Sequence, residues 1–257
     1  MSERDQSNLQ NNSVGKTITI LNCFSYDKPR LRIKEISAMT GISQPTVHRL
    51  LNVLKEFNLI EQREGLYSLG RGFLKYEGIV LKSMEIRRIC LPYIEELSNL
   101  LRINTNLAMI EDQEAVFIAR AETPYCEYSY FHIGMRRPVY CTAVGKVLAC
   151  KSPHLADEIF KHGVHRYTLN TITDKAQFLE ELERVRLQGY AVDFEEWKNG
   201  INCVAAPVFN AAGDIVAGIS ISGSASAHSV AKMKEYVPYI IEYSNRISAR
   251  VKLLEDE

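Results

Sequence analysis

Hydroxyl side chains recur along one predicted strand at the spacing that places them on a single face. The strand covers Ile215–Ser222, and because side chains alternate along a strand, Gly218, Ser220 and Ser222 share one face. Two hydroxyls beside a residue without a side chain suit a small polar ligand. A solvent-facing strand surface accounts for the same serines equally well, so the pattern alone leaves both interpretations open.

Further residues could complete a polar site. Thr142, Ala143 and Val144 predict a helix that starts after a capping threonine, and the free backbone N–H groups of a helix start bind carboxylate or phosphate. Asp193, on a short predicted strand, can accept a hydrogen bond from a ligand hydroxyl, although a turn or capping acid is an equal alternative. Cys203 lies on the strand predicted to pair with the serine strand.

The stretch Ile33–Leu69 predicts a winged helix-turn-helix. Apolar residues recur at helical spacing in two runs, between which Gly41 permits the positive φ that ends a helix and Ser43 can cap the next. Glu64-Gly65 then separates two short segments, which is a hairpin signal. An ordinary helix pair fits the periodicity alone. The turn, cap and hairpin together favour a module that puts its second helix into the major groove of DNA.

The outer face of that second helix, predicted over about Ser43–Phe57, carries side chains that can read bases. Gln44 can address adenine, and Arg49 can address guanine or phosphate. Val47, Leu50, Leu51 and Leu54 are predicted to pack inward. The predicted DNA contacts are Ser43, Gln44, Pro45, Thr46, His48 and Arg49, with Arg63 and more weakly Arg71 from the wing.

Charge is distributed unevenly between the two ends of the chain. The net charge of the 257 residues is zero, but residues 1–89 hold 14 Lys and Arg against 9 Asp and Glu, and the remainder carries the opposite excess. A basic N-terminal module beside an acidic C-terminal one keeps phosphate attraction local. The modest excess suits a few phosphate contacts per subunit and hence specific binding.

The remaining composition predicts a cytoplasmic protein. The six cysteines form no CxxC pair and no signal peptide precedes them, so we expect reduced thiols. No apolar run reaches transmembrane length, and no membrane contact is expected. His162 and His165 have a spacing that metal sites use, but no third ligand is evident, so neither a metal nor a cofactor is predicted.

The order of predicted elements indicates an α+β protein. We expect a disordered tail over 1–12, a winged helix-turn-helix over 13–70, a linker helix over 71–83 and an effector-binding domain over 84–257. The first helix should run from about Ser13 to Phe24 with Val14 and Ile18 inward. A third strand is predicted over Tyr128–Ile133, and one long helix over His228–Leu254.

Four segments together resemble the isocitrate lyase regulator (IclR) family of bacterial transcription factors, and the resemblance spans almost the whole chain from about Val14. The segments are GKTITILNCFS, TVHRLLNVL, IGMRRPVYCTAVGKVLA and GYAVDFEEWKNGINCVAAPVFNAAGDIVAGISISG. The resemblance implies a winged helix, a helical linker and a GAF-like effector domain. It also implies homodimers, often paired into homotetramers, that bind double-stranded operator DNA and respond to a small organic acid.

Carried over by position, the polar end of the family's effector pocket falls on residues that their types and spacing had already singled out. These are Ala143, Val144, Asp193, Cys203, Ser220 and Ser222. The pocket wall falls on Cys126, Ser129, Arg137 and Ile201. Family members that bind very small acids have an apolar wall. Three of the four wall residues here are polar or charged, which favours a larger or hydroxylated acid over one such as glyoxylate.

These observations predict a sequence-specific transcriptional regulator, a repressor rather than an activator, controlled by a hydroxylated or keto carboxylate. Asp193 should repel a second carboxylate of the ligand and accept a hydrogen bond from a ligand hydroxyl. Arg137 could instead pair with a second acidic group, so a dicarboxylate ligand stays open. The alternative is a hydrolase that uses Cys203 or a serine nucleophile and carries a basic N-terminal appendage. A nucleophile needs a paired base, and none is evident, so no enzyme is expected.

Overall fold

The computed structural model describes residues 12–125, 131–161 and 163–255. The predicted tail up to residue 11, the predicted wall residues Cys126 and Ser129, and His162 therefore lie outside the described residues. The chain divides into two compact units, Met1–Ser83 and Met84–Glu257.

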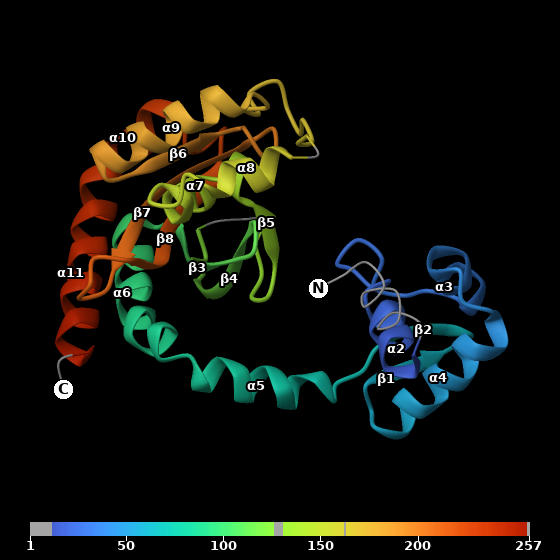
Figure 1. The fold of residues 1–257 in the computed structure, drawn as a ribbon. Coiled ribbons are helices and arrows are strands. Elements are labelled where there is room, and N and C mark those ends of the chain that lie inside the picture. The colour runs from blue at the N-terminus through green and yellow to red at the C-terminus, as the bar shows by residue number, and fades with distance from the viewer. Residues whose placement is uncertain (1–11, 126–130, 162, 256–257) are drawn as a thin grey trace. The chain divides into compact units, whose positions relative to one another are not determined.

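The first unit is a winged helix-turn-helix, as predicted (Figure 1). Three helices surround a core to which the wing contributes Ile60 and Tyr67. The elements are α2 (Ser13–Leu21), α3 (Ile33–Thr40), α4 (Gln44–Glu56), β1 (Ile60–Arg63), β2 (Leu66–Leu69) and α5 (Phe73–Ser83).

The turn between α3 and α4 forms partly as predicted. Gly41 ends α3 with a φ of +69°, a conformation that costs a glycine little because it has no Cβ. Ser43 occupies the N-cap of α4, but its side chain caps no backbone N–H and instead contacts the Thr46 hydroxyl at 3.0 Å. The helix start is stabilised by Pro45, whose fixed φ suits the first turn.

Apolar residues are exposed on two helices of this unit, α2 and α5. Helix α2 ends at Leu21, and Val14 and Ile18 are 72% and 51% exposed, so the prediction that they face inward is wrong. Helix α5 buries no residue within the described part of the unit. Its apolar Leu74 and Ile79 are therefore left uncovered by the unit's own core.

The second unit is built on an antiparallel sheet with helices on both faces (Figure 1). The strands that the structure describes follow the order β5-β4-β3-β8-β7-β6. Their bounds are β3 (Asn104–Glu111), β4 (Glu114–Ala121), β5 (Arg136–Pro138), β6 (Ala191–Phe194), β7 (Ile201–Phe209) and β8 (Ile215–Ser224). This α+β architecture confirms the predicted fold class.

Helices divide the core of this unit into two layers, one on each sheet face. Helices α6 (Glu85–Leu101) and α11 (Val237–Glu255) cover one face, and α7 (Ala143–Ala149) and α9 (Lys175–Gln188) cover the other (Figure 1). Two short helices, α8 (Leu155–Phe160) and α10 (Val230–Glu235), complete the unit. In the described part of the chain, no helix is both long and apolar enough to cross a membrane.

Two predicted elements differ in the structure. The strand predicted over Tyr128–Ile133 lies partly outside the described residues, positions 131–133 are not in a strand, and the third hairpin strand is instead β5, which pairs with β4. The long final helix is two helices, α10 and α11, because Pro238 lies in the first turn of α11 and has no N–H to continue the preceding helix.

Candidate functional sites

Helix α4 has one buried and one exposed face. Val47, Leu50, Leu51 and Leu54 are buried, as predicted. Gln44, His48 and Arg49 are exposed, and Thr46 is half-buried beside them. The amide, imidazole and guanidinium groups therefore lie on the face that the core leaves free, where they can donate to base edges or phosphates.

The wing places its cations beside a carboxylate. The guanidinium of Arg71 lies 3.2 Å from a Glu61 carboxylate oxygen, and that of Arg63 lies 3.9 Å from the same group. Both arginine side chains are largely exposed. Exposed ion pairs of this kind are weak, so either guanidinium can exchange the carboxylate for a phosphate.

The strand register of the second unit brings three predicted site residues into one row. Asp193 on β6 lies opposite Cys203 on β7, and Cys203 lies opposite Ser222 on β8. Directly opposed residues in antiparallel strands point to the same face of the sheet. All three are buried, so the solvent-facing interpretation of the serine strand is wrong.

A second row lies beside the first. Ser220 faces Ala205 on one side and Asn106 on the other, and Asn106 faces Arg120. The Ser220 backbone pairs within the sheet, but its hydroxyl forms no hydrogen bond with a group that the structure describes. The sequence reasoning missed Asn106 and Arg120, although a polar side chain at an alternating position of an otherwise apolar strand was a usable signal.

Helix α7 packs over these rows at a glycine. A Cβ on Gly218 would lie 2.8 Å from Val144 Cγ2, so the missing side chain allows the close approach of the helix. Ala143 and Val144 form the first turn, and the Thr142 hydroxyl accepts the Gly145 N–H at 3.2 Å. Because α7 has only seven residues, its dipole contributes little, and the side chains of the sheet must supply most of the polar contacts.

Asp193 organises the turn that follows its strand. Its Oδ1 accepts the backbone N–H of Glu196 at 2.7 Å and that of Trp197 at 3.4 Å, which leaves Oδ2 for a ligand. Burial, reinforced by the nearby Glu196 carboxylate, raises the pKa of Asp193 to about 7. Near neutral pH the protonated and ionised forms of Asp193 are therefore both populated. The acid form can donate a hydrogen bond, and the carboxylate form can only accept one.

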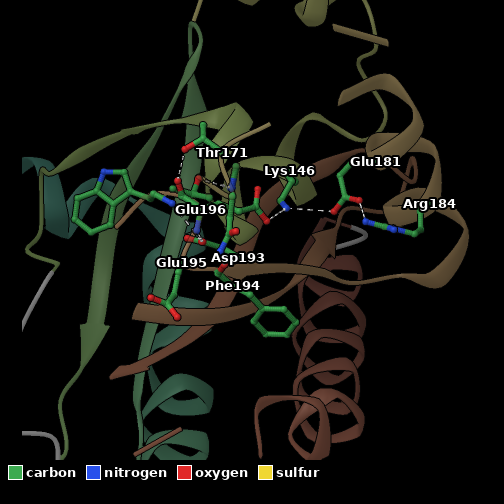
Figure 2. Close-up of polar contacts among 12 residues, drawn as sticks. Lys146, Thr171, Glu181, Arg184, Asp193, Phe194, Glu195 and Glu196 are labelled. Atoms are coloured by element: carbon green, nitrogen blue, oxygen red, sulfur yellow. Dashed lines mark hydrogen bonds and ion pairs between the residues drawn. The ribbon is translucent and has the colours of Figure 1, made fainter. Parts of the chain in front are cut away.

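A buried ionic cluster adjoins Asp193 (Figure 2). The Lys146 Nζ lies 2.6 Å from Glu196 Oε1 and 3.2 Å from Glu181 Oε1, and Glu181 also pairs with Arg184. The Thr171 hydroxyl donates to the Glu196 carbonyl at 2.7 Å. These contacts join α7, α9 and the turn after β6. A lone lysine in a run of small apolar residues was the sequence signal for this cluster.

Of the four predicted wall residues, the structure describes Arg137 and Ile201. The Arg137 guanidinium carbon lies 4.2 Å from the centre of the Trp197 ring, at cation–π distance. Trp197 also lies against Phe131, whose ring contacts Phe117. Ile201 is buried two residues before Cys203, on the same strand face. Trp197 and Phe131 thus lie beside Arg137 as aromatic neighbours that the four predicted positions did not include.

The thiols lack the environment of a nucleophile. Burial raises the pKa of Cys203 well above its ordinary value, and the Asp193 and Glu196 carboxylates raise it further. Burial likewise raises the pKa of Cys141. The cysteines that the structure describes are free thiols, and its described residues include no group of three or more His, Cys, Asp or Glu placed to hold a metal.

Family models match both units. The model of the IclR helix-turn-helix domain covers residues 13–64, and that of the bacterial transcriptional regulator IclR C-terminal domain covers residues 78–249. The HTH-type transcriptional regulator XynR of Escherichia coli K12 is 32% identical over 82% of this chain and 85% of its own. The regulator KdgR of the same organism is 32% identical, over 93% of this chain and 92% of its own.

Solved structures agree with this assignment. The IclR protein of Thermotoga maritima matches with a TM-score of 0.73 and 28% identity, over 93% of this chain and 98% of its own. An IclR homologue from Microbacterium hydrocarbonoxydans, solved with 4-hydroxybenzoate, matches with a TM-score of 0.77 and 19% identity over 93% of this chain and all of its own, and at this identity supports the fold alone.

The relatives are named as HTH-type transcriptional regulators, and the matched family models are those of DNA-binding regulators rather than of enzymes. The expectation that the chain is not a hydrolase is thereby confirmed. With both units matched by the family's own models, the chain belongs to the IclR family of bacterial transcriptional regulators.

Proposed function

We propose that this regulator is a cytoplasmic repressor that leaves its operator when a hydroxylated or keto organic acid binds the second unit. Occupancy of a promoter by a DNA-bound dimer is enough to exclude polymerase, whereas activation would need an additional polymerase contact. The row Asp193, Cys203 and Ser222, buried and directly cross-strand, is the observation that carries the proposal.

The chemistry of the two rows selects the ligand class. Ser220 and Ser222 supply hydroxyls for a carboxylate or a keto oxygen. Asp193 Oδ2 suits a ligand hydroxyl, since Oδ1 is already occupied by two backbone N–H groups. Arg137, over Trp197, can pair with a second acidic group, so a dicarboxylate remains compatible with the wall. The proposed effector contacts are Cys126, Ser129, Arg137, Ala143, Val144, Asp193, Ile201, Cys203, Ser220 and Ser222.

The proposed DNA contacts lie on the exposed face of α4 and on the wing. Gln44 and Arg49 would read bases, and Arg63 would bind the backbone. Ser43, Pro45, Thr46 and His48 complete the proposed surface. One such helix covers too few base pairs for selective binding, so we propose a homodimer, or a homotetramer formed from two of them.

The experiment combines operator selection with ligand titration. Duplexes that bind the full chain are selected from a random library. The complex of the chain with the enriched duplex is then titrated with pyruvate, D-gluconate and 4-hydroxybenzoate. Trp197, the one tryptophan of the chain, reports binding by fluorescence, and anisotropy of labelled duplex reports release. We expect one of these acids to quench Trp197 and to release the duplex. Quenching without any change in DNA binding would contradict the proposal.

Two variants locate the ligand. Ser220→Ala removes a hydrogen bond to a charged group and should weaken binding of that acid about tenfold to a hundredfold, equivalent to about 1.5–3 kcal/mol. Ser98→Ala is the matched control, because Ser98 is equally buried but donates to the Ala121 carbonyl from α6. Equal affinities of the two variants would place the effector elsewhere.

A further inference from the structure

A buried hydrogen bond joins two residues that are 116 positions apart. The Asn106 Nδ2 lies 3.1 Å from the Ser222 Oγ. Asn106, on β3, faces Ser220 directly and reaches diagonally along β8 to Ser222. Both side chains are buried, Asn106 completely. Ser222 thus receives a fixed partner from the middle of the sheet.

The guanidinium of Arg120 sets the direction of this hydrogen bond. Its Nη1 lies 3.4 Å from Asn106 Oδ1 and 2.8 Å from the Phe131 carbonyl oxygen. An arginine has donors only, so the amide atom that faces it must be the oxygen. The amide nitrogen then faces Ser222, and the Ser222 oxygen must accept. The Ser222 proton is consequently free to donate to a different acceptor.

That proton lies in the row that contains Cys203 and Asp193. Arg120 is held in place by a contact with Glu122 at 2.8 Å, and only 7% of its side chain is exposed. A chain of donors that starts at a buried cation polarises each successive hydrogen bond in one direction. The final donor in the chain, the Ser222 hydroxyl, therefore favours a ligand atom that carries negative charge.

We propose that Asn106, oriented by Arg120, is a positioning residue that fixes Ser222 as a hydrogen-bond donor, so that this end of the effector site selects a carboxylate over a neutral amide. The inference rests on the proposed effector site and specifies which chemical group of the effector occupies it. A ligand carboxamide can turn its own oxygen toward Ser222, but it lacks the charge that the Arg120 chain favours.

The test replaces the amide by a group of the same shape that can only accept. In Asn106→Asp, the carboxylate would pair with Arg120 and take the Ser222 proton. The probes are whichever of pyruvate, D-gluconate and 4-hydroxybenzoate binds the wild type, together with the carboxamide of that acid. We expect about a tenfold loss of affinity for the acid and little change for the carboxamide, measured by Trp197 fluorescence and calorimetry.

A double-mutant cycle separates positioning from simple repulsion by the new charge. If Asn106 acts through Ser222, Asn106→Asp has no further effect on acid affinity in a Ser222→Ala background. Additive losses would overturn the proposal, as would an unchanged preference for acid over carboxamide. Asn202→Asp is the matched control, since Asn202 is also buried in the sheet but donates to the His228 carbonyl at 2.8 Å.

Two outcomes distinguish this inference from the proposed function. If Ser220→Ala and Ser222→Ala weaken acid binding but Asn106→Asp does not, the effector site stands and the positioning role falls. If none of the three acids binds the wild type, the proposed effector class fails and this inference fails with it. Should Asn106→Asp not fold, Arg120→Met, which removes the donor that orients the amide, should lower the preference for acid over carboxamide severalfold.

Discussion

The Lys146 ammonium lies 2.6 Å from a Glu196 carboxylate oxygen, and the lysine side chain is only 1% exposed (Figure 2). Glu196 is also the residue whose backbone N–H is held by Asp193. The ion pair therefore fixes the turn that carries Trp197 to helix α7, in the layer that α7 and α9 form. Two buried carboxylates, Glu181 and Glu196, share this one ammonium group.

Lys146→Met should lower the free energy of unfolding by about 3–5 kcal/mol, because it leaves two buried carboxylates without their common cation. Urea denaturation at pH 7 measures the change. Lys175→Met is the matched control, since Lys175 pairs with Asp157 on the surface. That variant should cost less than about 1 kcal/mol. Equal losses would mean that the buried cluster does not stabilise the unit.

Ligand affinity should depend on pH through Asp193. Burial raises its pKa to about 7, so the group gains a negative charge as the pH rises through neutrality. An anionic effector should therefore bind about tenfold more tightly at pH 6 than at pH 8. Trp197 fluorescence titrations across this range measure the affinity. Asp193→Asn should flatten the profile, and a profile as steep as that of the wild type would assign the titration to another group.

The same pKa fixes the direction of a stability change. The folded state holds the Asp193 proton more tightly than the unfolded state, in which the carboxyl has its ordinary pKa of 3.8. The contribution of Asp193 to the free energy of unfolding is thus fully present below the unfolded pKa and is lost as the pH rises to about 7. Lys146, Glu196 and Cys203 surround the group and are unchanged in Asp193→Asn, which should remove this decline.

Arg49→Ala should cost about 1–3 kcal/mol of binding to the selected duplex and relax the preference at one base position, if Arg49 reads a base. Arg63→Ala is the comparison. Loss of a contact to the DNA backbone should weaken binding to all duplexes alike and reduce the slope of log affinity against log salt concentration by about one. Anisotropy titrations over several salt concentrations measure both quantities. Unaltered affinity and preference in Arg49→Ala would remove α4 from the proposed interface.

The spacing of residues along the chain predicted those structural features that depend only on sequence neighbours. Alternation placed Ser220 and Ser222 on one strand face, and helical periodicity separated Arg49 from Val47 on α4. Residue type and the predicted strands singled out Asp193 and Cys203, and the family resemblance placed both in the same site as the serines. These positions needed no knowledge of strand order. The break between α10 and α11 at Pro238 also depends on the local sequence. It was missed because the apolar pattern on both sides of the proline resembles that of one continuous helix.

Long-range register could not be predicted in this way. Asn106 meets Ser222 only because β3 lies beside β8, and the spacing of either strand says nothing about its partner. Lys146 and Glu196 are 50 positions apart and belong to different elements. A buried lysine is unusual enough to indicate a partner, but the sequence offered many carboxylates.

The apolar face of α5 should be covered by a second copy of the chain. Ile79 is 58% exposed and Leu74 62%, and an isolated helix of eleven residues is marginal in water without packing. We expect light scattering to give a dimer or tetramer at micromolar concentration. Ile79→Glu should dissociate it, because association would bury an unpaired charge. Leu169→Glu, at a position 92% exposed, is the control and should assemble normally. A wild-type chain that stays monomeric with and without the selected duplex would rule out assembly through this face.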